Sequence, residues 1–126
     1  MAQQRLWVAL LVILLLKSKP TESNHYVVGD NEGWTYGVSS WPKGKVFYHN
    51  NVLVCMYEAV FNYQAGFHNV VRVNRHEYET CQPNPNSKTY DSGHDELRLK
   101  RGMNYFICSV PGHCHDGGMN ISINAL

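Results

Sequence analysis

Apolar and polar residues alternate strictly in the last segment of the chain. Between residues 119 and 124 the odd positions are apolar and the even positions are polar, which is the period-two pattern of a strand with one buried face. Met119 is therefore expected to point inward together with Ile121 and Ile123. Residues 96–100 alternate in the same way, with leucines on one face and charged side chains on the other. Both segments are predicted to be strands with one face against the core and the other toward solvent.

Further short runs rich in β-branched and aromatic residues are separated by clusters of glycine, asparagine and aspartate. They predict strands at residues 26–28, 46–48, 52–54, 70–73, 97–99 and 105–108. A short helix is expected near residues 38–41 or 77–81. Several short strands at close intervals favour an all-β sandwich or barrel over α/β units.

An unbroken apolar run, residues 6–16, follows Arg5 near the start of the chain. This run is too short to span a bilayer comfortably, but it fits the hydrophobic region of a secretory signal peptide. A polar stretch comes next, and cleavage is expected near Ser23. We therefore predict a signal peptide at residues 1–23 and a single domain at residues 24–126, with no membrane span.

The charge balance bounds the choice of partners. The chain of 126 residues carries 11 basic and 10 acidic side chains, a formal net charge of +1. Three of the basic residues and one acidic residue lie in the predicted signal peptide, so the domain keeps 8 basic and 9 acidic residues. A nearly neutral domain has no electrostatic attraction for nucleic acid. We therefore expect no binding to nucleic acid. We also expect the protein to be a monomer.

The stretch of residues 105–120, YFICSVPGHCHDGGMN, brings three kinds of metal donor close together. Cys108 offers a thiolate, His113 an imidazole and Met119 a thioether. One thiolate and two imidazoles in a plane, with a weak axial thioether, suit copper, and His68 is the candidate for the second imidazole. Because these four ligands leave no equatorial position for a substrate, the pattern favours one-electron transfer over an enzyme.

Other interpretations of the same residues stay open at this point. Cys108 could be half of a disulfide, with His113 a solvated loop residue and Met119 part of the core. His115 is a rival ligand by its spacing. A zinc site is the weaker metal alternative, because structural zinc sites use more thiolates or histidines and have little use for methionine.

A series of short motifs runs through residues 25–126 in a fixed order. They are YVVGD at 26–30, GWT at 33–35, WPKGK at 41–45, FNY at 61–63, FHNVV at 67–71, YFIC at 105–108 and PGHC at 111–114. In this order the motifs resemble those of the phytocyanins, the plant blue copper proteins, and within them the plantacyanin or basic blue protein group. The resemblance implies a cupredoxin-like fold, which is a two-sheet Greek-key β-sandwich with one or two short helices. It also implies one type 1 copper ion as the cofactor.

The resemblance further implies roles for residues around the copper site. It pairs Cys81 with Cys114 in a disulfide, whereas the sequence alone allows other pairings. Such a bridge would close a loop of about 33 residues and contribute on the order of 3 to 4 kcal/mol. The resemblance also gives Asn69 a hydrogen-bonding role that holds the Cys108 loop from outside the ligand set.

The implied function is that of an extracellular copper protein that carries single electrons and is not an enzyme. Its redox partner, a protein or a small molecule, is unidentified, and its location is the plant cell wall or apoplast. A patch formed by Val110 and Pro111 is expected around the His113 edge, where electrons would enter and leave. The alternative is a copper-free structural or signalling module of the cell surface, as in phytocyanin relatives that have lost ligands.

Two features depart from the pattern of the family. Five residues instead of four separate His113 from Met119, and we expect the flexible pair at 117–118 to absorb the extra residue. Six residues, 55–60, interrupt the run that leads to Phe61. They are expected to form an extruded loop or a protruding hairpin.

Two further residues are candidates for modification. Cys55 lies in the interrupting segment, and we expect a buried, inert thiol, with an intermolecular disulfide as the alternative. Asn120 begins the sequon Asn-Ile-Ser and is a candidate glycosylation site. A regular strand beside a metal loop is nevertheless an awkward acceptor for a glycan.

Overall fold

The computed structural model describes residues 24–50 and 56–126. The predicted signal peptide at residues 1–23, the predicted strand at residues 52–54 and the state of Cys55 lie outside these ranges. Within them, no helix is both long and apolar enough to cross a bilayer.

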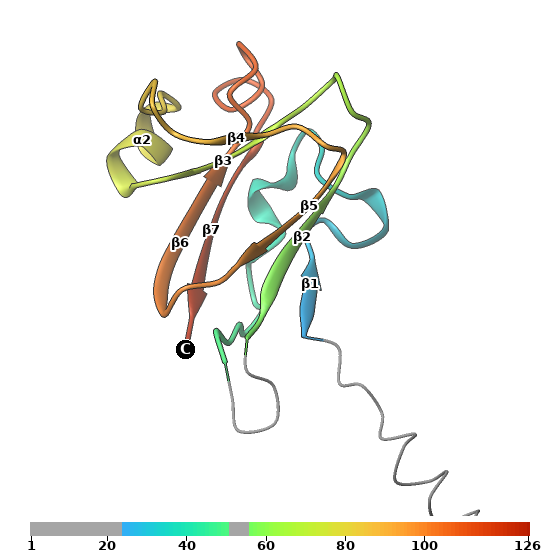
Figure 1. The fold of residues 1–126 in the computed structure, drawn as a ribbon, viewed down its shortest axis with the longest axis vertical. Coiled ribbons are helices and arrows are strands. Elements are labelled where there is room, and N and C mark those ends of the chain that lie inside the picture. Colours follow the sequence, from blue (N-terminus) through green and yellow to red (C-terminus); the bar gives the residue numbers. More distant parts are fainter. Residues whose placement is uncertain (1–23, 51–55) are drawn as a thin grey trace, which may run out of the picture.

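One of the two sheets has three strands in the order β1-β2-β5 (Figure 1). These strands are β1 (His25–Val27), β2 (Glu58–Asn62) and β5 (His94–Arg98). β1 runs parallel to β2, and β5 runs antiparallel along the other side of β2. In β5, Asp95 and Leu97 are buried and the other three residues are exposed, so the alternation predicted there is confirmed.

The other sheet has four antiparallel strands in the order β4-β3-β6-β7. They are β3 (Val70–Val73), β4 (Thr89–Tyr90), β6 (Gly102–Ile107) and β7 (Asn120–Ala125). The helix α2 (Arg75–Thr80) follows β3, and two 3-10 helices, η1 (Asp30–Glu32) and η2 (Val38–Ser40), follow β1. Asn74 begins α2 because its side-chain oxygen accepts the backbone N–H of Glu77 at 2.8 Å, a group that lacks a partner within the helix.

The inner faces of the two sheets form the core. Phe61 of β2 and Phe106 of β6 join them, with ring centroids 5.0 Å apart. The indole of Trp34 packs edge-on against Phe61 at 5.1 Å. Ile121 and Ile123 of β7 are fully buried, as the alternation in the sequence predicted.

The outer faces of the two sheets differ. α2 lies over β3 and β6, where Tyr78 and Cys81 pack against a second buried cluster: Val71, Val73, Ile107 and Cys114. The outer face of the three-stranded sheet instead exposes His25, Val27 and Glu96 to solvent.

The predicted all-β sandwich is confirmed, and most predicted elements form with shifted ends. η2 and α2 account for the two expected helices. Of the segment 46–48, only Phe47 pairs, through an isolated bridge to Ala125. β4 was missed because its two residues follow a turn rich in asparagine and proline and show no apolar run.

The prediction that residues 55–60 form an extruded loop is wrong for Glu58 to Val60. These residues lie in β2 and pair with a strand on each side, and Ala59 and Val60 are buried. Two ladders of backbone hydrogen bonds and the buried apolar side chains make a strand more favourable here than a solvated loop. Phe61 keeps its inward orientation, as the even length of the segment requires.

Candidate metal centre

The loop between β6 and β7 and the turn that leads into β3 lie at one end of the sandwich, the upper end in Figure 1, and they carry the predicted copper ligands. β6 ends at Ile107, so Cys108 is the first residue of the loop that leads to β7, and His113 lies in the middle of that loop. His68 belongs to the turn that enters β3. Because β3 and β6 are antiparallel neighbours, the start of β3 lies beside the end of β6.

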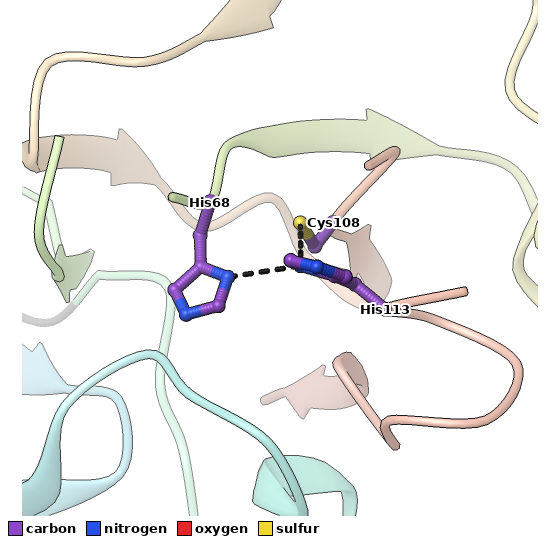
Figure 2. A group of neighbouring side chains, drawn as sticks. All are labelled: His68, Cys108 and His113. Carbon is purple, nitrogen blue, oxygen red and sulfur yellow. Dashed lines mark hydrogen bonds between the residues drawn. The ribbon is translucent and has the colours of Figure 1, made fainter. Parts of the chain in front are cut away.

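Figure 2 shows the side chains of His68, Cys108 and His113 pointing toward one another. Nδ1 of His68 lies 3.0 Å from Nδ1 of His113, and Sγ of Cys108 lies 3.6 Å from the same His113 atom. Each of the three donor atoms lies within 4.8 Å of the other two. Cys108 is fully buried and the two histidines are half-buried.

This spacing fits a single metal ion. Two donors that bind one ion at about 2.0 to 2.3 Å in a trigonal plane lie about 3.5 to 3.7 Å apart. The 3.6 Å separation between Cys108 and His113 agrees with that arrangement, and the closer pair of imidazole nitrogens would have to open only slightly. One thiolate and two imidazoles are the trigonal set that suits copper.

The protonation state of His68 also suits a metal. The close contact between their Nδ1 atoms needs one donor and one acceptor, so one Nδ1 offers a lone pair. Burial, followed by the charge of His113, lowers the pKa of His68. The His68 imidazole is therefore neutral at pH 7, which is the form that binds metal ions.

Met119 lies at the junction of the loop and β7. Its side chain is fully buried, so the inward orientation predicted from the sequence is confirmed. Its backbone N–H donates to the carbonyl of His113 at 3.0 Å, and its carbonyl accepts the N–H of Cys108 at 3.0 Å. These two bonds hold Met119 against both ligands of the loop.

The extra loop residue is accommodated in a compact turn. The carbonyl of Gly112 accepts the N–H groups of Asp116 and Gly117 at 3.1 and 3.0 Å. Gly118 has a φ of 66°, in the left-handed region that glycine adopts without strain. A Cβ atom on Gly117 would lie 2.6 Å from the carbonyl oxygen of His113 and 2.7 Å from the ring of Tyr36. The two glycines therefore have separate roles, because Gly118 allows the backbone turn and Gly117 makes room for a carbonyl group and an aromatic ring.

A disulfide ties the ligand loop to α2. Cys81 and Cys114 are bonded, with an S–S distance of 2.02 Å. Cys81 is the residue that ends α2, and Cys114 directly follows His113. The bridge is the pairing that the resemblance implied, and it restrains the chain next to one metal ligand.

Asn69 joins the turn that carries His68 to the loop that carries Cys108. Its side chain accepts the Ser109 N–H at 2.7 Å and donates to the Ser109 hydroxyl at 2.9 Å. Its backbone N–H points to Sγ of Cys108 at 3.5 Å, and its carbonyl accepts the indole N–H of Trp34 at 2.8 Å. A hydrogen bond of this kind to a ligand atom orients the ligand and tunes the metal.

Tyr36 is the residue near the site that sequence reasoning missed. Its hydroxyl oxygen lies 3.2 Å from Nε2 of His113. Its ring makes edge contacts with the rings of His68 and His113, at centroid distances of 5.2 and 5.0 Å. A single tyrosine between two turns carries no pattern that would connect it to a loop 77 residues away.

Two other candidates from the sequence lie apart from the cluster. The His115 side chain pairs with Asp116 at 3.0 Å and is 79% exposed, and it is not among the donors that gather with His113 in the described residues. Asn120 is the first residue of β7 and is half-buried.

Comparisons with known proteins identify the family. A family model described as a plastocyanin-like domain matches residues 31–119. A chemocyanin from Lilium longiflorum is 47% identical over 115 residues, which cover 91% of this chain and 86% of the relative. A basic blue protein from Cucumis sativus is 46% identical over 101 residues, covering 80% of this chain and 98% of the relative.

Solved structures show the same fold. Cucumber basic protein, described as a blue copper protein, matches with a TM-score of 0.73 and 45% identity over 81% of this chain and 99% of that chain. Spinach plantacyanin matches with a TM-score of 0.64 and 46% identity, over 75% and 94% of the two chains. The chain belongs to the plastocyanin-like family of blue copper proteins and, within it, to the plant phytocyanins of the plantacyanin and basic blue protein group.

Proposed function

We propose that this protein binds one type 1 copper ion and carries single electrons between redox partners. The observation that carries the proposal is the convergence of donor atoms from His68, Cys108 and His113 on one point. Membership of the blue copper family supports it. The names of the relatives, among them basic blue protein and blue copper protein, point to the same cofactor.

Each side chain at the site has a distinct role in this proposal. His68, Cys108 and His113 would hold the copper, and Met119 would supply a weak thioether ligand. Copper, when bound, supplies the one-electron chemistry by alternating between Cu(II) and Cu(I). The Asn69 hydrogen bonds and the nearby disulfide restrain the loop, so the ligands would move little when the copper gains or loses an electron.

Electrons are proposed to enter and leave at the edge of His113. The imidazole is half-buried, and Pro111 and Gly112 are exposed beside it in the loop. Tyr36 and Phe67, which are 56% and 59% exposed, add aromatic surface near the two histidines. An apolar surface of this kind suits brief docking of a redox partner, whether a protein or a small molecule.

The absorption spectrum of the oxidised protein tests the proposal. With Cu(II) bound to a thiolate, an intense band is expected at about 600 nm. Cys108→Ser should remove the band while the protein stays folded, and Cys55→Ser is the matched control that should keep it. A natural sequence that binds no copper would contradict the proposal and favour the copper-free module, and a Cu(II) complex without the band would contradict the thiolate ligand.

We further propose that the protein is secreted and acts in the plant cell wall or apoplast. The apolar run at residues 6–16 has the length of a secretory signal. N-terminal sequencing of the protein recovered from extracellular fluid should show a start near residue 24. Retention of the full-length chain inside the cell would contradict this location.

A further inference from the structure

A second group of metal-type donors lies on the outer face of the three-stranded sheet. In the strand register, His25 of β1 is opposite Glu58 of β2, and Glu96 of β5 is opposite Val60 of β2. Side chains at alternate positions along a strand share a face. His25, Glu58, Val60 and Glu96 therefore share the outer face, away from the core and from the copper ligands.

The donor atoms of this group converge. Nε2 of His25 lies 3.4 Å from a carboxylate oxygen of Glu58 and 3.9 Å from a carboxylate oxygen of Glu96. One donor atom from each residue lies within 4.8 Å of the others, as in the copper centre. Nε2 of His94 lies 3.0 Å from the other oxygen of Glu96, so both oxygens of this carboxylate are engaged.

The sheet holds these side chains in place but leaves them accessible. Val60 is only 4% exposed although it lies on the outer face, so neighbouring side chains close over it. The side chains of His25, Glu58 and Glu96 are 38%, 23% and 44% exposed, so an ion can reach all three from solvent. Three adjacent strands thus fix the donors on a paired backbone and not on a mobile loop.

The chemistry of the cluster also suits a cation. Glu58 and Glu96 place two carboxyl groups beside the His25 imidazole, and carboxylate oxygens and imidazole nitrogens both bind divalent ions.

We propose that His25, Glu58 and Glu96 form a second metal site, for a divalent transition ion of the zinc type. One imidazole nitrogen and two carboxylate oxygens are usual zinc ligands, and three protein ligands leave a position for water. The set has no thiolate, so it cannot give a blue copper centre. His94 orients Glu96 from outside the ligand set, as partners of metal-bound groups commonly do.

The consequence of binding lies in the N-terminal strand. β1 has three residues and forms the edge of its sheet. An ion shared by His25, Glu58 and Glu96 would link β1 to both β2 and β5. Zinc should therefore slow the opening of β1 and raise the protection of its amides from hydrogen exchange.

The test uses protein loaded with Cu(I), so that the copper ligands are occupied and the sample is diamagnetic. Titration with Zn²⁺, followed by calorimetry, should show one equivalent of zinc bound in addition to copper. His25→Gln and Glu96→Gln should each weaken zinc binding more than about 10-fold, and His94→Gln should weaken it by about 10-fold. His76→Gln, at an exposed histidine of α2, is the matched control and should bind zinc as the natural sequence does.

A second measurement keeps the test valid if a variant folds poorly. In the natural sequence, zinc should shift the NMR signals of His25, Glu58 and Glu96 and raise amide protection in β1. The proposal is overturned if the copper-loaded protein binds no additional zinc. It is equally overturned if zinc binds with the same affinity in His25→Gln and Glu96→Gln, or shifts signals elsewhere only.

Discussion

At the copper centre, residues that are not ligands position those that are. The Asn69 side chain forms hydrogen bonds with the backbone N–H and the hydroxyl of Ser109, and its backbone N–H points at the Cys108 sulfur. Tyr36 covers the edge of His113 and touches the ring of His68. Changing these neighbours should tune the site without dismantling it.

Met119 offers a test of the axial position. A thioether stabilises Cu(II) less than an amide oxygen does, and an alkyl side chain supplies no donor at all. Met119→Gln should therefore lower the reduction potential clearly, and Met119→Leu should raise it, with the blue band kept in both. Voltammetry and electron paramagnetic resonance would measure the effect. If neither variant changes the potential or the resonance parameters, Met119 is a core residue and the axial position is empty or held by a backbone carbonyl near Gly66 or Phe67.

Tyr36 should tune the potential through His113. When Nδ1 of His113 binds copper, Nε2 carries the proton and donates to the Tyr36 hydroxyl, 3.2 Å away. Tyr36→Phe removes this acceptor, makes the imidazole a weaker donor and should lower the Cu(II) affinity about 10-fold. If the Cu(I) affinity is unchanged, the potential rises by roughly 60 mV.

The control for Tyr36 is another exposed tyrosine. Tyr48 is 44% exposed, and its ring packs on Tyr57 and not on a ligand. Tyr48→Phe should leave the potential unchanged. Equal potentials in the Tyr36→Phe variant and the natural sequence would show that the hydroxyl contact has no influence on the metal.

At the scale of elements, local patterns in the sequence predicted well where a strand is half-buried. The alternation at residues 119–124 gave β7 and the burial of Met119, and the ligand spacing pointed to the loop that follows β6. β2 was harder to predict, because side chains on both of its faces are buried, so its sequence shows no alternation of apolar and polar residues. Its strand conformation depends on pairing with β1 and β5, which are distant in sequence.

In the candidate site, too, some residues could be predicted from local spacing and one could not. Cys108, His113 and Met119 lie on one short loop, so their chemistry can be recognised from spacing. Tyr36 comes to the site only because its segment lies against that loop, where Gly37 N–H donates to the Gly117 carbonyl at 2.7 Å. No local pattern encodes a contact that depends on the packing of the whole fold.

A substitution at Asn104 tests how much the hydrogen bonds of one buried side chain contribute to holding the strands together. The Asn104 side chain is buried, with 2% exposure. Its amide oxygen accepts the backbone N–H of Lys100 at 2.8 Å and an N–H of the Arg72 guanidinium at 2.9 Å. Its NH₂ group donates to the carbonyls of Lys100 and Gly102 at 2.8 and 2.9 Å. Asn104→Ala should cost roughly 2 to 4 kcal/mol of unfolding free energy, because several partly buried groups lose their partners together.

Urea unfolding of the metal-free protein would measure this loss. Asn124→Ala, at an exposed asparagine of β7, is the matched control and should change stability by less than about 0.5 kcal/mol. The Asn104→Ala protein should keep its blue band, since Asn104 lies near the start of β6 and Cys108 follows its end. A loss no larger than that of the control would show that water replaces the amide without cost.

On the scale of the whole molecule, function and stability are concentrated at different places. The ligand loop and the turn before β3 lie at one end of the sandwich (Figure 1), while Asn104 lies toward the opposite end of β6. The aromatic contacts of Trp34, Phe61 and Phe106 occupy the core between the sheets. The Cys81–Cys114 disulfide serves both roles, because it closes a long loop and anchors the residue after His113.

Removing that disulfide should therefore affect stability and metal retention together. The double variant Cys81→Ser/Cys114→Ser lacks a link across a sequence separation of 33 residues, and the added chain entropy of the unfolded state should lower the unfolding free energy by about 3 to 4 kcal/mol. Urea unfolding of the metal-free variant and of the metal-free natural sequence measures this loss of unfolding free energy without any contribution from copper. The copper-loaded variant should still be blue, because all four proposed ligands remain, but it should release copper to a chelator faster than the natural sequence. If copper release is unchanged while stability falls, the bridge stabilises the fold alone and the hydrogen bonds of Asn69 and Met119 suffice to hold the ligand loop.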